Sequence, residues 1–407
     1  MFGESDSDEL RERQNRVIAR QARNMPRNVL EVRSSPVVLD DVKFAKGYGQ
    51  IEGRFWLNGA SGARIRKSYE AVNKEDWRRE RYLNAFHRTR SKGVSGLPTY
   101  DGKRASKMEI AIELKNGFNY YHFSTETLGS LAHFIDDDSM KPINIHLPKG
   151  DIKGFVKNFI DAVYPSLSER INFVSKPTRY KQVRSVYSHR HYLYCVNDEN
   201  VRAVLESPDM DPKWRGIALD PKRIGIAGIQ SYDESLAMLR REALSQAVGT
   251  ATLSTPRFIW MGRDETGQNA RVRGITGHQP LLEELMGRGF EVVAFEHLSP
   301  LEQIATMNGA DILIAPHGAG LANMTYAKPG ATVIEIGTRQ TQMHRWGDFA
   351  KCAHVSRCRY DTVFADITGL NDIAQIPPVS KGLLGVHVGK RATDRIISIV
   401  DEAMQAA

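Results

Sequence analysis

A glycine-rich segment, HGAGLANMTY, follows the apolar run ILIAP and begins at His317. Gly318 and Gly320 would let the backbone turn tightly and approach a ligand, because glycine has no Cβ. A helix is expected to begin directly afterwards, and its first N–H groups and positive dipole end would suit a phosphate. A Gly-x-Gly spacing is weak evidence by itself, since a tight turn before a helix also needs glycine. The segment therefore predicts an anion site or, as its alternative, a structural turn.

Two further groups could complete a site for a nucleoside diphosphate. Glu335 is expected at the end of the next strand, ATVIEIG, where a carboxylate could accept hydrogen bonds from a ribose diol. Arg263, Arg271 and Arg273 lie in the loop RDETGQNARVRG, after the strand-like run RFIWMG. Their guanidinium groups could bind a diphosphate through paired N–H donors. A solvated basic loop is the equally weighted alternative.

A histidine and a glutamate four positions apart, His122 and Glu126, share one face of the helix predicted over NYYHFSTETLGSLAHFI. Such a pair could act as a general base, because the carboxylate raises the basicity of the imidazole. The spacing alone favours a partly buried histidine in a local ion pair. His122 is nevertheless our candidate base, with Glu126 orienting it or acting in its place.

Two clusters contain residues that bind metals elsewhere. The run Asp136–Asp138 follows a predicted helix rather than an apolar strand, which favours a solvated turn. Cys352, His354 and Cys358 lack a fourth zinc ligand at recognisable spacing, and CAHVSRC also fits an ordinary strand. We therefore expect no metal site.

Strand-like and helical patterns alternate from about Met108 onwards. This alternation predicts an α/β fold with a parallel sheet and crossover helices. Within the first part of the chain, residues 1–33 are highly charged and predict a solvated helix or a frayed tail. We expect an N-terminal extension over 1–105, with a charged tail, short strands and a basic helix. An N-terminal Rossmann-like acceptor domain is expected over 106–230, and a C-terminal Rossmann-like nucleotide-binding domain over 231–380. The last segment, 381–407, is expected to form a helix that packs back on the first domain.

Composition limits the class of protein. The 407 residues, 41% of them hydrophobic, suffice for two domain cores. No run approaches the ~20 consecutive apolar residues of a membrane span, and the acidic start lacks the apolar centre of a signal peptide. Three cysteines in so long a chain fit a reducing cytoplasm.

The net charge of +8 is concentrated in residues 64–107, which hold 13 Lys/Arg against 5 Asp/Glu. The favoured interpretation of this basic block is a solvated helix face, and the alternative is contact with an anionic partner such as phospholipid headgroups.

The segment HGAGLANMTYAKPGATVIEI, preceded by LSPLEQIATMNGADILIAP, resembles the signature block of glycosyltransferase family 61. NYYHF with the glutamate after it is similar to the N-domain motif of that family, and MGRD with RVRG is similar to its arginine-bearing strand and loop. GRFWLNGASGARIRKS resembles the lead-in hairpin of bacterial members of the capsular-polysaccharide type. The likeness runs loosely from about residue 50 to 375 and is tight over 295–337.

This resemblance implies a GT-B-like architecture, with two Rossmann-type domains facing a cleft. It also implies inversion at the anomeric carbon and no obligatory metal or other cofactor. The expected substrates are a nucleotide-sugar donor, of the UDP-sugar type, and a glycan or lipid-linked acceptor in surface or capsular polysaccharide synthesis. The expected location is the cytoplasm, with contact to the inner membrane face through residues 64–107.

The resemblance also implies roles for particular residues. Arg263 and the Gly318–Gly320 turn would hold the diphosphate, His317 and Asn323 would line the cleft, and Glu335 would face the nucleoside. His122 would face the acceptor. The full set carried over to donor binding is Arg263, Arg271, His317, Gly318, Ala319, Gly320, Leu321, Asn323 and Glu335.

Two other classes of function compete with this one. A dinucleotide-dependent oxidoreductase would need G-x-G-x-x-G after a strand, and the loop at Gly318 lacks the third glycine. A non-catalytic nucleic-acid-binding protein could use the basic block with its aromatic residues Trp77, Tyr82 and Phe86. No RNA- or DNA-binding motif accompanies them, so we expect no specific nucleic-acid partner.

Overall fold

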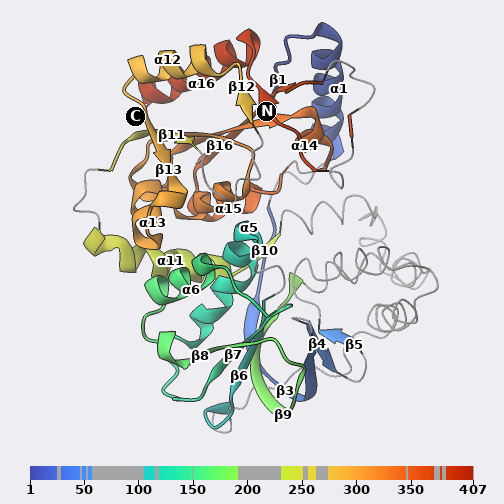
Figure 1. Ribbon diagram of the computed structural model, residues 1–407, viewed down its shortest axis with the longest axis vertical. Coiled ribbons are helices and arrows are strands. Elements are labelled where there is room, and N and C mark those ends of the chain that lie inside the picture. The colour runs from blue at the N-terminus through green and yellow to red at the C-terminus, as the bar shows by residue number, and fades with distance from the viewer. Residues whose placement is uncertain are drawn as a thin grey trace, which may run out of the picture. The chain divides into compact units, whose positions relative to one another are not determined.

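The computed structural model describes two compact units of the chain (Figure 1). The C-terminal unit, as we call it, combines Met1–Met25 with Ala243–Ala407, and the central unit spans Pro26–Glu242. This grouping differs from the predicted segments, because the first 25 residues belong with the C-terminal part of the chain rather than with a separate extension. The described residues are 1–24, 29–45, 48–51, 54–56, 105–114, 119–148, 150–190, 231–250, 255–262, 274–344, 347–370, 376–377 and 382–406.

The C-terminal unit is built on an eight-stranded sheet of order β12-β17-β16-β15-β14-β11-β13, with β1 also paired to β16. Neighbours from β13 to β16 are parallel, which confirms the predicted α/β class. The bounds are β1 Phe2–Gly3, β11 Phe258–Gly262, β12 Ile275–Thr276, β13 Glu291–Ala294, β14 Ile312–Pro316, β15 Thr332–Thr338, β16 Arg359–Ile367 and β17 Val386–His387.

The order of these strands changes direction at β11. The chain first adds β13 on one side of β11 and then adds β14, β15 and β16 in turn on the other side. Open α/β sheets bind ligands at the carboxyl ends of the strands that flank such a reversal. The topology therefore marks the edge where β11 and β14 end.

Helices cover both faces of this sheet (Figure 1). α12 (Gln279–Gly287) and α16 (Lys390–Ala406) lie on one face, and α13 (Pro300–Gly309) and α15 (Ala350–Ser356) lie on the other. The sequence predicts that the last helix packs on the first domain. Instead, α16 buries five residues in one core with α12 and the strands of its own unit, namely Ala392, Ile396, Ile399, Val400 and Ala403.

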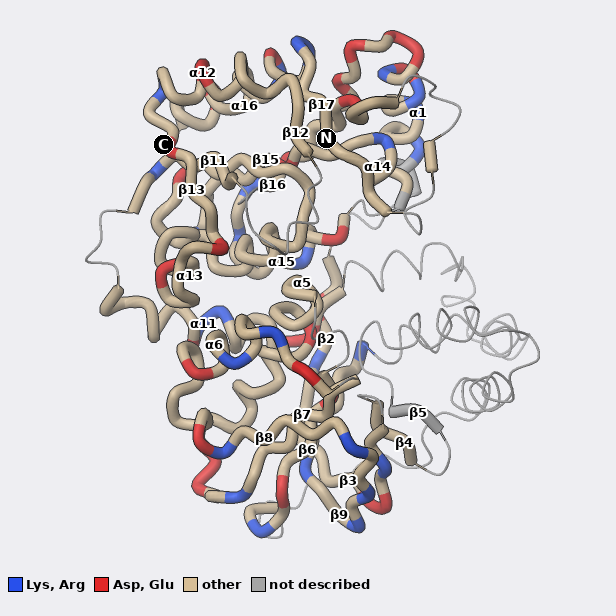
Figure 2. The backbone as a smooth tube through the Cα atoms, viewed as in Figure 1, with Lys and Arg blue, Asp and Glu red and all other residues tan. Residues whose placement is uncertain are grey.

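The charged N-terminal segment forms α1 (Asp8–Asn24), so the frayed-tail alternative is wrong. The acidic residues of α1 all lie in its first five positions, and each pairs with an arginine three or four positions further on (Figure 2). The helix is also docked, because Gln14 is fully buried. The Gln14 side chain accepts a hydrogen bond from Ser5 N at 3.2 Å and donates one to Ala365 O at 3.2 Å. These contacts, together with the burial of Leu10, hold α1 in place.

The central unit is built on a seven-stranded sheet of order β5-β4-β3-β9-β6-β7-β8. β6, β7 and β8 are parallel, whereas β3 is antiparallel to both β4 and β9. β3 belongs to the short strands expected in the 1–105 extension, but it lies inside the sheet because its apolar residues pack in a core with Ala111 and Val183. The bounds are β3 Ser34–Ala45, β4 Tyr48–Ile51, β5 Arg54–Trp56, β6 Ile110–Glu113, β7 Ile143–His146, β8 Ile171–Val174 and β9 Thr178–Ser188.

Helical segments connect the three parallel strands of the central unit. Between β6 and β7 lie α5 (Tyr120–His122), the π-helix η1 (Phe123–Thr127) and the 3-10 helix η2 (Leu128–Phe134). α6 (Gly154–Val163) connects β7 to β8. β2 (Glu31–Val32) and β10 (Tyr232–Asp233) form a separate two-stranded parallel sheet, and α11 (Ser235–Ala247) follows β10 in the chain. Across the described part of both units, no helix combines the length and the apolar character needed to cross a bilayer.

Asp137, from the acidic run after η2, is engaged by two buried arginines. Arg184 donates from Nη1 to its Oδ1 at 2.7 Å, and Arg170 donates from Nη2 to its Oδ2 at 2.7 Å. Burial raises the pKa of Asp137, but the hydrogen bonds from the two arginines outweigh burial and lower it. Asp136 and Asp138 are exposed. The predicted solvated turn is therefore correct for the outer two aspartates and wrong for the middle one.

His146, at the end of β7, is buried among aromatic rings. Its ring stacks on Phe44 with centroids 4.4 Å apart, and its Nε2 is hydrogen-bonded to the Tyr180 hydroxyl at 2.9 Å. Burial lowers the pKa of His146 to about 4 and, as the largest of several effects, raises the pKa of Tyr180 to about 12.

We expect His146 to make the protein less stable as the pH falls from about 6.5 toward about 4. In this window the unfolded chain binds a proton that the folded protein excludes, so the free energy of unfolding rises with pH. The difference between these two pKa values of His146 corresponds to about 3 kcal/mol in the free energy of unfolding. Urea denaturation of wild type and His146→Gln across this range measures it. Equal pH slopes for the two proteins would contradict the prediction.

Candidate functional site

The candidate site of the C-terminal unit lies where β11 and β14 end. After β14, the 3-10 helix η6 (Ala319–Tyr326) begins, and a Cβ added to Gly320 would lie 3.3 Å from Met261 Sδ. Gly320 therefore lets the start of η6 approach the end of β11. Gly318 has φ 179° and ψ 168°, an extended conformation that other residues also adopt, so the backbone angles of the predicted tight turn do not require glycine at this position. Since the residue before η6 is glycine, no side chain caps its first N–H groups.

His317, the first residue after β14, is held by a buried carboxylate. Its Nδ1 is hydrogen-bonded to Glu335 Oε1, and the exposed fractions of the two residues are 8% and 4%. The other oxygen of Glu335 accepts hydrogen bonds from the Tyr360 hydroxyl and, at 3.4 Å, from Thr362 Oγ1. Glu335 is opposite Ala315 in the middle of β15, not at the end of the strand as the sequence predicts. Its oxygens therefore face protein groups.

Tyr360 is suited to donate to this carboxylate. Burial, and next the negative charge of Glu335, raise the pKa of Tyr360 well above its ordinary value. The hydroxyl therefore keeps its proton and acts as a hydrogen-bond donor. The ring of Phe349, just before α15, packs edge-on against His317 with centroids 5.4 Å apart. The imidazole is thus fixed both by a hydrogen bond and by an aromatic contact.

The other residues predicted for the glycine-rich segment divide into two groups. Gly318, Ala319 and Gly320 are partly exposed, so their backbone can meet a ligand. Leu321 and Asn323 are 1% exposed, and Asn323 donates to Gln303 Oε1 of α13 at 3.3 Å. The side chains of Leu321 and Asn323 therefore pack η6 against the protein interior and do not line its exposed surface.

The candidate base of the central unit is also paired with a carboxylate. His122 Nδ1 and Glu126 Oε1 are 3.2 Å apart, and the side chains are 18% and 4% exposed. The side chain of Asn119 accepts a hydrogen bond from His122 N at 3.4 Å and so caps the helix that carries it. Glu126 belongs to the π-helix η1, and π-helical turns are rare and frequent at functional sites.

Several predicted site residues lie outside the described residues. These are Arg263 and Arg271, with Arg273 beside them, and nearly all of the basic segment 64–107. The structure does describe Gly262, the last residue of β11, which lies at the same edge of the sheet as Gly318 and Gly320.

The CAHVSRC segment is helical rather than the strand that we predicted. α15 contains Cys352 and His354, and it ends at Arg357, which has φ +59°. Cys352 is buried and Cys358 is half-buried. Among the described residues there is no group of three or more His, Cys, Asp or Glu side chains placed to hold a metal ion.

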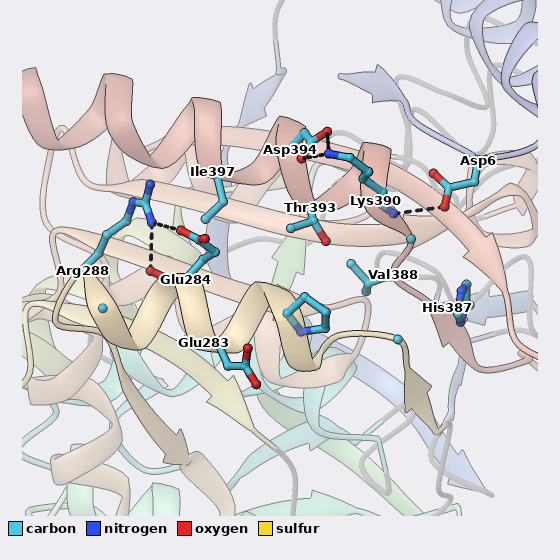
Figure 3. A pocket seen from close by; sticks show the side chains of 14 residues that line it. Asp6, Glu283, Glu284, Arg288, His387, Val388, Lys390, Thr393, Asp394 and Ile397 are labelled. Carbon is cyan, nitrogen blue, oxygen red and sulfur yellow. Dashed lines mark hydrogen bonds and ion pairs between the residues drawn. The ribbon is translucent and has the colours of Figure 1, made fainter.

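A surface groove lies between α12 and α16 (Figure 3). Its basic side chains already have acidic partners, because Arg288 pairs with Glu284 and Lys390 pairs with Asp394. Asp6 accepts hydrogen bonds from the backbone at the start of α16. The lining includes no residue of β11, β14 or η6. The groove is therefore separate from the candidate site.

Sequence reasoning missed three residues around His317, namely Tyr360, Thr362 and Phe349. In the run RYDTVFADI, Tyr360 and Thr362 are two positions apart and so lie on the same face of the strand, which is the one signal that they share a polar partner. The partner could not be read from the sequence, because Thr362 lies opposite Glu335 only through the register of β15 and β16.

The C-terminal unit is an α/β unit with a parallel sheet, and a histidine–carboxylate pair lies beside the reversal of its strand order, the edge where α/β sheets of this kind bind their ligands. The family model described as Glycosyltransferase 61 matches residues 120–334, more than half of the chain. The protein belongs to glycosyltransferase family 61, as the resemblance predicted, and is therefore a transferase.

The match includes both candidate histidines and ends one residue before Glu335. A glycosyltransferase in general uses a nucleotide-sugar donor and a glycan acceptor, which favours this function over the oxidoreductase and nucleic-acid-binding alternatives. A search of curated proteins found no significant match to the chain.

Proposed function

We propose that the protein is an inverting, metal-independent glycosyltransferase that transfers a hexose or pentose from a UDP-sugar to a glycan or lipid-linked acceptor. The supporting observation is the open start of η6 beside His317, at the reversal of strand order in the C-terminal unit. The proposal includes the GT-B architecture and the surface or capsular polysaccharide pathway that the family resemblance suggests. It places the reaction in the cytoplasm, with the 64–107 segment as a contact to the inner membrane face.

In this proposal the diphosphate of the donor binds the first N–H groups of η6 and the side chains of Arg263 and Arg271. Backbone N–H groups at a helix start and guanidinium groups both stabilise phosphate oxygens, and together they can neutralise a leaving diphosphate without a divalent ion. His317 contributes its side chain to the same phosphates. Glu335 supports His317 and does not contact the nucleoside, because its oxygens are bound within the protein.

His122 would take the proton from the acceptor hydroxyl as the new glycosidic bond forms. An inverting transfer needs such a base, because the acceptor oxygen attacks in a single displacement. The hydrogen bond between His122 and Glu126 orients the ring for this role.

We expect UDP to bind the wild-type protein in EDTA, and Arg263→Ala to weaken that binding. A charge-assisted contact to phosphate is typically worth about 1.5–3 kcal/mol, which corresponds to roughly a 10- to 100-fold loss of affinity. Isothermal titration calorimetry with UDP, GDP, CDP and NAD measures this. Arg257→Ala is a matched control, because Arg257 precedes β11 at its opposite end and pairs with Asp311.

Three outcomes would contradict the proposal. Binding of NAD without any nucleoside diphosphate would favour the oxidoreductase. UDP binding that needs magnesium or manganese would overturn metal independence. Unchanged affinity in Arg263→Ala would mean that Arg263 is only a surface residue.

A further inference from the structure

α14 (Arg339–His344) follows β15 directly and packs against α1 in the C-terminal unit (Figure 1). The side chain of Gln342 donates a hydrogen bond to the backbone oxygen of Gln14 at 3.0 Å, and Arg339 donates from Nη1 to Gln342 Oε1 at 2.5 Å. Arg13 precedes Gln14 in α1. These two hydrogen bonds therefore hold the guanidinium group of Arg339 near that of Arg13.

Arg13, Arg20 and Arg339 form a group of basic side chains that we call the arginine cluster. Arg20 lies seven positions after Arg13 and therefore on the same side of α1. Arg13 pairs with Glu9 at 2.5 Å, whereas no carboxylate in the described part of the chain pairs with Arg20 or Arg339. Three arginines and one glutamate leave a net charge of +2 on this surface.

The arginine cluster is costly to the protein as long as nothing neutralises it. Burial lowers the pKa of Arg339 from its ordinary value, and the positive charges of Arg20 and Arg13 lower it further. An arginine side chain nevertheless keeps its proton in proteins, so the repulsion among the three groups persists. A bound anion would relieve that repulsion.

The number and kind of these charges favour a phosphate or diphosphate group as the anion. Guanidinium groups present paired N–H donors in one plane, which match the oxygens of a phosphate. A phosphate monoester carries a charge of about −1.5 to −2 at neutral pH, close to the opposite of the +2 on the cluster. A single carboxylate would neutralise only half of that charge.

The arginine cluster lies at the carboxyl edge of the sheet, where the candidate site also lies. His317 N donates to Ile336 O of β15 at 2.9 Å. Arg339 follows Ile336 by three residues, so the two Cα atoms are no more than about 11 Å apart. An anion held by Arg339 would therefore be a close neighbour of a donor bound at the start of η6.

We propose that Arg13, Arg20 and Arg339 form a second anion-binding site, which holds a phosphate or diphosphate group of a lipid-linked acceptor while the donor occupies the start of η6. This inference rests on the proposed function for the identity of the acceptor. Arg339 binds the group from the edge of the sheet, and the two arginines of α1 bind it from the side. The N-terminal helix thus has a role in substrate binding besides its structural one.

Calorimetry with inorganic pyrophosphate tests the site, and saturating UDP keeps the donor site filled. We expect one pyrophosphate to bind wild type, and Arg20→Gln and Arg339→Gln each to weaken this binding by about 10- to 100-fold. Arg391→Gln is the matched control, because Arg391 is an exposed arginine of the same unit whose charge acts on Asp8, at the other end of α1.

Thermal unfolding gives a second readout that needs no UDP. In low salt and without pyrophosphate, Arg20→Gln is expected to unfold at a higher temperature than wild type, because it removes repulsion. Saturating pyrophosphate should reverse this order, since a ligand stabilises the protein that binds it more tightly. If Arg339→Gln does not fold, Arg20→Glu reverses the charge at an exposed position and is expected to abolish pyrophosphate binding.

The source of the anion is distinguished by farnesyl diphosphate, which carries the same group on a prenyl chain. Binding tighter than that of pyrophosphate, and weakened by the same variants, supports a lipid-linked acceptor. Tighter binding of free pyrophosphate would contradict that source. Binding to vesicles of anionic phospholipid, with no binding of pyrophosphate, would overturn the proposal in favour of a membrane contact.

The remaining outcomes separate this inference from the proposed function. Unchanged pyrophosphate affinity in Arg20→Gln and Arg339→Gln, or an equal loss in Arg391→Gln, overturns the anion site. Displacement of pyrophosphate by UDP would mean that the arginine cluster belongs to the donor site and is no second site. If UDP does not bind wild type, the proposed function fails, while pyrophosphate alone still shows whether the arginine cluster binds an anion.

Discussion

Replacing His122 by alanine is expected to lower turnover by about 10²–10⁴-fold while donor affinity stays near that of wild type. The His122–Glu126 pair is fixed by the Asn119 cap and by the π-helical turn, so the imidazole has one defined orientation. A general base acts on the acceptor, and its loss therefore affects the chemical step rather than binding of the donor. His317→Ala is expected to weaken donor binding as well, which distinguishes the two histidines.

Turnover is measured with a saturating nucleotide sugar, and donor affinity is measured separately by calorimetry. His387→Ala provides a control for loss of a histidine, because His387 is exposed in β17 and contacts Thr276. Near-normal turnover in His122→Ala, or a defect confined to donor affinity, would exclude His122 as the base. Glu126→Gln would then be the next variant to test.

Asp137→Ala is expected to destabilise the central unit by about 3–5 kcal/mol, because it leaves two buried arginines without their shared carboxylate. Arg170 and Arg184 are 8% and 3% exposed, so water cannot readily replace Asp137 as their partner. Urea denaturation measures the loss. Asp138→Ala, one position away and exposed, is expected to change stability little.

If Asp137→Ala does not fold, Asp137→Asn keeps the shape of the side chain and removes the charge, and it should still be less stable than Asp138→Ala. A metal site makes the opposite prediction. In that case Asp137→Ala would keep its stability, lose activity and respond differently to added magnesium or manganese. That result would show that the acidic run binds a metal rather than two arginines.

The parts of the fold that local pattern determines were predicted from the sequence. The apolar runs of β11, β14 and β15 are strands, as expected, since buried parallel strands have continuous apolar sequences. The spacing of Ser299 and Glu302 in SPLEQ also fits a capping box, and α13 begins with one: Ser299 N donates to Glu302 Oε2 at 2.7 Å and Glu302 N donates to Ser299 Oγ at 3.4 Å.

The features that depend on distant pairings were not predicted. The burial of Glu335 in the middle of β15 follows from strand register, which sequence spacing does not reveal. The role of Asp137 depends on arginines 33 and 47 positions away. The helical α15 was mistaken for a strand because its seven residues are too few for a helical period to stand out.

The way in which the first 25 residues join the C-terminal unit also affects how the chain can fold during synthesis. β1 pairs with β16 through Phe2 and Val363, so a partner for the first strand leaves the ribosome only after more than 350 further residues have been made. Contacts this distant in sequence form slowly, because a long loop must close before they are made. The central unit, whose chain is continuous, can fold first. Before β16 is synthesised, the charges along α1 would help to keep the unpaired N-terminal segment from aggregating.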